Sequence, residues 1–96
     1  MEINQRIYNG DRAREVLENE AFAAAFDDIR QEITDQWKQS PVRDHEGREK
    51  LYELLRLTDK LEATLRRSLE TGKLAVEELK YQRTLAERAK ELVGLG

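Results

Sequence analysis

One polar stretch decides the fold, Ser40-Pro-Val-Arg-Asp-His-Glu-Gly-Arg48, which holds the only proline and the only histidine of the chain. On either side of it, apolar residues recur every three or four positions, which is the spacing of one face of an α-helix. The residue before a proline avoids helical backbone angles, so the first helix is expected to end at Ser40. Two amphipathic helices joined by a short loop each need an apolar partner. The sequence therefore predicts an all-α protein built on an antiparallel helical hairpin.

The two long helices of this hairpin are predicted over residues 20–39 and 45–71. Asp44 is a residue type that favours the N-cap position, where a side-chain oxygen accepts a hydrogen bond from an unpaired backbone amide. The apolar stripes of the two helices are expected to form the core. They comprise Phe22, Phe26, Ile29, Ile33 and Trp37 on the first helix and Leu51, Leu55, Leu65 and Leu69 on the second. For Trp37 the alternative is an anchor that faces a partner protein.

The segment before residue 20 is predicted to form a short helix over residues 11–18, which Asp11 could cap. Its apolar side lies nearly opposite the stripe that follows, so a straight helix would expose one of the two faces. Asn19, another N-cap residue type, therefore marks a kink or break. The Asn9-Gly10 pair is typical of a turn, and residues 1–10 are expected to be a flexible arm.

The segment after residue 71 admits two interpretations. Thr71-Gly72 is a plausible helix stop, which favours a separate C-terminal helix over residues 73–93 and a frayed tail over 94–96. The rival is one unbroken helix over residues 45–93, because Val76 and Leu79 keep the helical phase of the preceding leucines. In that case the two ends of one rod would bury opposite faces, which suits an oligomer.

Two further sets of apolar residues are predicted to contact other proteins. The leucine strip (Leu54, Leu57 and Leu61) widens the apolar face of the second long helix beyond what one partner helix needs. The distal strip (Leu74, Tyr81, Leu85 and Leu92) lies roughly opposite the leucines of the hairpin core. A chain of 96 residues with 39% hydrophobic residues makes one domain with a thin core, so oligomerisation is expected to complete the fold.

Charge and composition exclude several classes of protein. The net charge is −3, and the first 39 residues hold nine acids against five bases, which argues against a nucleic-acid clamp with a basic face. The absence of cysteine removes disulfides and thiolate metal sites. No apolar run reaches the roughly 20 residues of a membrane span, so no membrane contact is expected.

No residue set in the sequence points to catalysis. The five glycines lie apart and form neither a phosphate-binding loop nor a dinucleotide-binding motif. His45 is the only candidate imidazole base, and no glutamate has a histidine three residues further on, as a di-metal helix bundle requires. We therefore expect no catalytic residue, no cofactor and no metal ion, and we predict that the protein is not an enzyme.

Three strings stand out within about residues 11–75: Arg12-Ala-Arg-Glu-Val-Leu-Glu-Asn19, the loop pattern Pro41…Arg43-Asp44…Gly47-Arg48-Glu49 and Glu70-Thr-Gly-Lys73. In these strings the chain resembles small helical proteins encoded among the head-assembly and packaging genes of tailed bacteriophages. The resemblance implies a structural or accessory role in virion assembly, with synthesis in the host cytoplasm, and it supplies no catalytic residues.

The apolar helix faces, the charge distribution and the resemblance together suggest three functions. The first is a non-enzymatic assembly protein that docks its helix faces on further copies of itself or on a larger phage structural protein. The second is a DNA-packaging accessory akin to a small terminase subunit, which needs a basic face and a recognition helix that the sequence does not display. The third is a phage-encoded inhibitor of a host protein, which the acidic N-terminal region favours.

Overall fold

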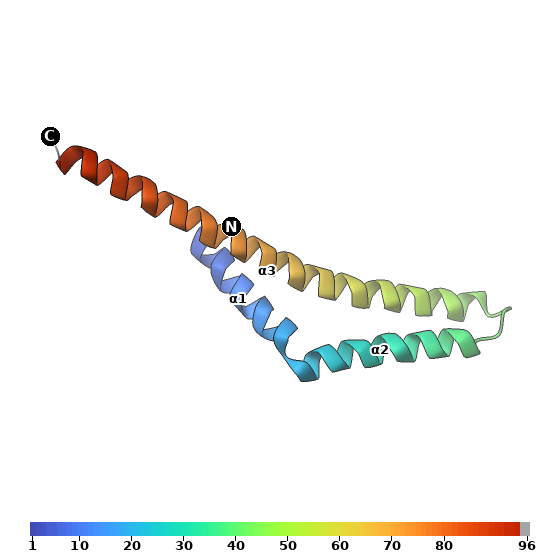
Figure 1. The fold of residues 1–96 in the computed structure, drawn as a ribbon. Coiled ribbons are helices and arrows are strands. Elements are labelled where there is room, and N and C mark those ends of the chain that lie inside the picture. Colours follow the sequence, from blue (N-terminus) through green and yellow to red (C-terminus); the bar gives the residue numbers. More distant parts are fainter. Residues whose placement is uncertain (95–96) are drawn as a thin grey trace.

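The computed structural model describes residues 1–94, which form three α-helices and no strand. Helix α1 spans Ile3–Glu18, α2 spans Glu20–Gln39 and α3 spans His45–Gly94. Figure 1 shows α3 as one long rod, with α2 beside its first half and α1 crossing its middle. The particle measures 80 × 25 × 15 Å. The all-α class is confirmed.

Local hydrogen bonds explain where the helices begin and end. Asn19 lies between α1 and α2, and its Oδ1 accepts a hydrogen bond from the backbone N–H of Phe22 at 3.0 Å. Asp44 precedes α3, and its Oδ1 accepts from the backbone N–H of Gly47 at 3.0 Å. These caps satisfy amides that have no partner within the first helical turn. The predicted break at Asn19, the bounds of α2 and the cap at Asp44 are confirmed.

Helix α1 begins earlier than the sequence suggested. The expected turn at Asn9-Gly10 is wrong, and so is the cap at Asp11, because α1 starts at Ile3 and runs through both. Residues 3–10, expected within a flexible arm, are therefore helical. The carboxylate of Glu2 caps this helix by accepting a hydrogen bond from the backbone N–H of Asn4 at 2.8 Å.

Helix α3 continues through the predicted stop. The separate helix over residues 73–93 is wrong, and the rival single helix describes the structure, because α3 is continuous from His45 to Gly94. Gly72 has no positive φ, so it does not end a helix in the left-handed conformation. Gly94, the first residue of the predicted frayed tail, is helical, and residues 95–96 of that tail lie outside the described residues.

The glycines inside α1 and α3 face each other where the two helices cross. A Cβ atom built on Gly10 would lie 2.8 Å from Cα of Gly72 and 3.0 Å from the carbonyl oxygen of Ser68. Only residues without a side chain allow two helix backbones to approach this closely. Ala13 and Ala75 complete the contact and are 3% and 0% exposed. Glycine at positions 10 and 72, inside the two helices, is thus what allows α1 to pack this closely on α3.

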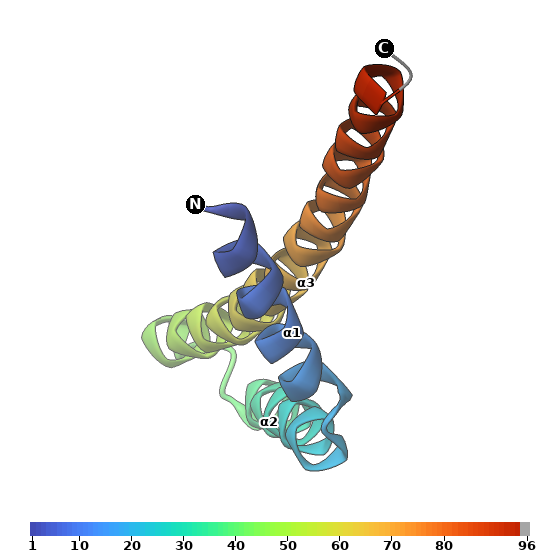
Figure 2. The same cartoon turned by 90° about the vertical axis from the view of Figure 1, so that its left-hand side faces the viewer.

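A second, smaller contact joins α2 to the first half of α3. Phe26 and Ile33 are its buried apolar residues. Between this contact and the crossing of α1, the junction of α1 and α2 bends away from α3, as Figures 1 and 2 show. The radius of gyration is 22.1 Å, whereas a compact domain of this length would have about 12.5 Å. The core therefore consists of two separate contacts along an extended rod.

Several residues expected in the core are only partly covered. Phe22, Ile29 and Trp37 are 39%, 45% and 46% exposed, so their assignment to the core does not hold in the single chain. The reason is that α2 touches α3 along one narrow line and no other helix covers its remaining apolar side. The leucines of α3 assigned to the core are half-buried: Leu51, Leu55, Leu65 and Leu69.

Candidate interaction surface

An ion-pair network centred on Arg30 holds α2 to α3 where their apolar contact is thin. Its Nε donates a hydrogen bond to Oδ1 of Asp59 at 3.1 Å, and its Nη2 donates to Oε2 of Glu62. Glu62 also accepts a hydrogen bond from Nη2 of Arg66, on its own helix, at 2.8 Å. The Arg30 guanidinium in addition lies over the ring of Phe26, 5.6 Å from its centroid. Charge and aromatic contacts therefore supplement the apolar packing at this point.

The network shifts the protonation equilibria of its members. Hydrogen bonds from Arg66 and then from Arg30 lower the pKa of Glu62 below its ordinary value. The same contact with Glu62, followed by that with Asp59, raises the pKa of Arg30. Each charged form is stabilised by its neighbours. The α2–α3 contact is thus strongest while Glu62 is ionised.

At the loop end of α2 and α3, an aromatic residue lies beside an apolar hollow. The guanidinium of Arg48 lies over the indole of Trp37, 4.3 Å from the ring centroid. The hollow measures about 310 Å³. Its lining residues are Ile33, Thr34, Trp37, Leu51, Tyr52 and Leu55. The half-exposed indole of Trp37 can therefore contact either a partner protein or the apolar residues between α2 and α3.

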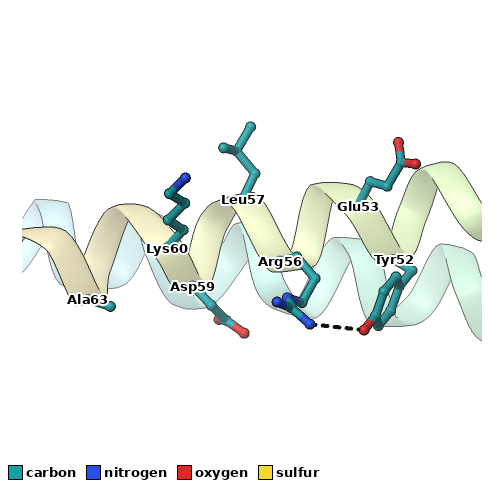
Figure 3. Close-up of a pocket in the computed structure, with 7 residues that line it drawn as sticks. All are labelled: Tyr52, Glu53, Arg56, Leu57, Asp59, Lys60 and Ala63. Atoms are coloured by element: carbon teal, nitrogen blue, oxygen red, sulfur yellow. Dashed lines mark hydrogen bonds between the residues drawn. The ribbon is translucent and has the colours of Figure 1, made fainter.

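The leucine strip of α3 is largely open to solvent. Leu54, Leu57 and Leu61 are 51%, 63% and 51% exposed. Figure 3 shows Leu57 on one side of α3, while Tyr52 and Arg56 project from the other side and are joined by a hydrogen bond of 3.1 Å. Within residues 1–94 at least half of each of these three leucines stays uncovered, so they remain available to another protein.

Leu74 of the distal strip lies beside the crossing of α1 at Gly72. The other three residues of the strip lie on the part of α3 that extends past α1, which Figure 1 shows in orange and red. Every described residue from Lys80 to Gly94, which we call the α3 extension, is exposed. The exposed fractions of the strip are 70% for Leu74, 66% for Tyr81, 47% for Leu85 and 74% for Leu92. All seven residues predicted to contact other proteins are therefore exposed in the single chain.

Other kinds of site have little basis in residues 1–94. Within this range, no three acidic, histidine or cysteine side chains converge on a point where a metal ion could be held. None of the described helices has an apolar segment of the length needed to cross a membrane. His45 lies exposed in the first turn of α3. The exposed apolar faces are the features of this surface best suited to binding.

Two groups of residues that shape this surface were not expected from the sequence. Gly10 and Ala13 of α1 have the same spacing as Gly72 and Ala75 of α3, and this shared Gly-x-x-Ala pattern was the available signal for a close helix crossing. The bridge between Arg30 and Glu62 joins residues far apart in the sequence. Local charge patterns give no signal for such a pair, because each residue also has nearer partners on its own helix.

Comparison with protein families, with curated proteins and with solved structures gives no match for this chain. The function therefore has to be inferred from the surface described above. Its two apolar strips and its shallow core are the features that any functional proposal must explain.

Proposed function

We propose that this chain is a non-enzymatic interaction protein that docks its exposed helix faces on other proteins during the assembly of a phage particle. The observation that carries the proposal is the exposed leucine strip, in which Leu57 is 63% exposed. Exposed apolar surface that is continuous along one helix face is typical of a protein–protein contact. The partners are further copies of this chain and a larger structural protein of the particle.

The shape of the chain supports this proposal. A single chain 80 Å long and 15 Å thick buries little apolar surface of its own. The hairpin of α2 and the first half of α3 would serve as the working unit, and neighbouring subunits would cover its open side. The resemblance of residues 11–75 to proteins of phage head-assembly gene clusters favours a role in the virion.

The test is a substitution in the middle of the leucine strip. Leu57→Glu places a charge on this face without removing a buried side chain, so the helical circular dichroism signal should persist. We expect this variant to lose binding to the partner or to further copies, measured by solution mass and by co-purification with assembling particles. Val42→Glu is the matched control, since Val42 is 78% exposed and lies outside both strips.

Two results would contradict the proposal. If Leu57→Glu binds and assembles as well as the Val42→Glu control, the leucine strip is not a contact surface. If Leu57→Glu instead unfolds the protein, Leu57 belongs to the core of the chain.

A further inference from the structure

The distal strip continues a regular pattern that includes two charged residues. Along α3, the residues facing the same side are spaced alternately four and three apart, which is the a/d spacing of a coiled coil. In order they are Leu74, Glu78, Tyr81, Leu85, Arg88 and Leu92. One acid and one base thus lie within an otherwise apolar line of 19 residues, about 28 Å long at 1.5 Å per residue.

This line is symmetric about Arg83. Leu74 and Leu92 lie nine residues to either side of it, Glu78 and Arg88 lie five, and Tyr81 and Leu85 lie two. If two such helices pack in opposite directions around a two-fold axis at the level of Arg83 along the helix, each residue meets its counterpart. Leucine then packs on leucine, tyrosine packs on leucine, and Glu78 meets Arg88 of the second copy.

We propose that two copies of this protein pair residues 74–92 of α3 as an antiparallel two-stranded coiled coil, with Glu78 of each copy against Arg88 of the other. The inference rests on the proposed function and names the partner of the distal strip. A two-fold axis is the usual symmetry of a homodimer. Here it produces two pairs of opposite charge in each dimer.

The charges select the direction of the pairing. In a parallel coiled coil each position meets its own copy, so Glu78 would face glutamate and Arg88 would face arginine. Both contacts would repel, whereas the antiparallel arrangement converts both into attraction. Specificity of this kind comes from penalising the wrong alternative as well as from stabilising the right one.

The rest of the chain leaves room for this partner. Helix α1 packs on α3 at Gly72 and Ala75, about 130° around the helix from the centre of the distal strip at 100° per residue. The Glu78 carboxylate accepts a hydrogen bond from Nη2 of Arg6 at 3.2 Å, yet its side chain is 46% exposed. A second arginine can therefore reach it from the open side.

The network on α2 and α3 provides a precedent for a carboxylate with two arginine partners. Glu62 accepts hydrogen bonds from both Arg30 and Arg66. In the proposed dimer Glu78 would have the same surroundings, with Arg6 from its own chain and Arg88 from the second copy. Beside this line, Glu77 is paired with Lys80 of its own helix at 3.7 Å. This pairing offsets the negative charge that Glu77 would bring near acids of the second copy.

A partner would also stabilise the α3 extension. Its 15 residues are all exposed, and most of the stability of a helix in a protein comes from packing of its apolar face. Pairing would bury the distal strip of both copies and give these turns the packing that the single chain lacks.

A charge exchange tests the proposal. Arg88→Glu places two acids opposite each other, and we expect the dimer dissociation constant to rise by about tenfold or more, which corresponds to about 1.4 kcal/mol. Glu78→Arg should weaken the dimer in the same way. The combined variant Glu78→Arg/Arg88→Glu restores opposite charges and should return to within a few-fold of the wild type. The measurement is solution mass by light scattering over a concentration series, with the dimer at twice the 11.2 kDa of one chain.

Arg83→Glu is the matched control for this series. It makes the same charge change, but Arg83 lies about half a turn around α3 from the distal strip. We expect it to leave the dimer intact. Equal weakening by Arg83→Glu and Arg88→Glu would overturn the proposal, as would a combined variant that is no better than either single one.

Cross-linking tests the direction of the pairing. The chain has no cysteine, so Leu74→Cys and Leu92→Cys variants can be mixed and oxidised, with a size tag on one of them. The antiparallel pairing predicts cross-links between the two variants, and exclusive cross-links within each variant would refute it. A wild type that stays monomeric while Leu57→Glu still abolishes partner binding would refute the dimer and leave the proposed function standing.

Discussion

Replacing Gly72 by alanine tests the close crossing of α1 and α3. The new Cβ atom would lie 2.8 Å from Cα of Gly10 and 3.2 Å from the carbonyl oxygen of Arg6, both of them backbone atoms. Neither can move without shifting a whole helix, and overpacking of this kind typically costs about 1–3 kcal/mol. Alanine favours the interior of a helix over glycine by about 1 kcal/mol, which opposes this cost. We therefore expect Gly72→Ala to lower the free energy of unfolding by about 1 kcal/mol.

The assay is urea or thermal unfolding followed by circular dichroism, at one fixed protein concentration because association also affects stability. A loss of about 1 kcal/mol corresponds to a fall of about 4–8 °C in the melting temperature for a domain of this size. Gly94→Ala is the control, because a Cβ atom there would meet nothing within 4 Å. If Gly72→Ala instead stabilised the protein by about 1 kcal/mol, the two helices would not meet backbone to backbone.

Three further predictions concern the contacts of α2. Glu62 has a lowered pKa, so its contribution to stability is complete above the ordinary pKa of 4.5 and is lost as the pH falls through the pKa of the folded protein. Glu62→Gln should therefore flatten the fall in the free energy of unfolding below pH 4.5. An acid profile unchanged from the wild type would contradict this. Phe26→Ala removes a side chain that is 7% exposed and should lower the free energy of unfolding by about 3 kcal/mol. Phe22 is 39% exposed, so Phe22→Ala should lower it by less than half as much in the same assay. Equal losses would refute the burial pattern. Arg48→Ala removes the cation above Trp37 and should alter the fluorescence of this only tryptophan, whereas Lys50→Ala should not.

The features that the sequence predicted well are those that depend on neighbouring residues. An N-cap needs only a short polar side chain within reach of the next turn, so Asn19 and Asp44 could be assigned without knowledge of the fold. The end of α2 follows in the same way from Pro41, which restricts the backbone of the residue before it. These are local effects, and tertiary packing left them unchanged.

The features that the sequence predicted poorly depend on distant parts of the chain. Glycine serves both as a helix stop and as a site where two helices touch, and Thr71-Gly72 has the same local pattern in either case. Only the contact with Gly10 decides between them. Similarly, the spacing of Ile29 and Trp37 predicts an apolar face but not whether the same chain covers it. That depends on how far α2 diverges from α3.

The same reasoning applies to the contact surface. The spacing of Leu57 and Leu85 predicted apolar strips beyond the need of the hairpin, and the structure leaves both residues exposed. The proposed pairing of Glu78 with Arg88 was not foreseen, because their symmetry about one point matters only once α3 is known to run unbroken past Gly72.

Amide hydrogen exchange of the α3 extension is the most direct test of whether another copy covers it. Exchange would be followed residue by residue from dilute to concentrated protein, with Arg88→Glu measured alongside. We expect the amides of residues 80–94 to become strongly protected as the concentration rises in the wild type, and to remain weakly protected in Arg88→Glu. Protection that is independent of concentration and identical in both proteins would contradict coverage by a second copy.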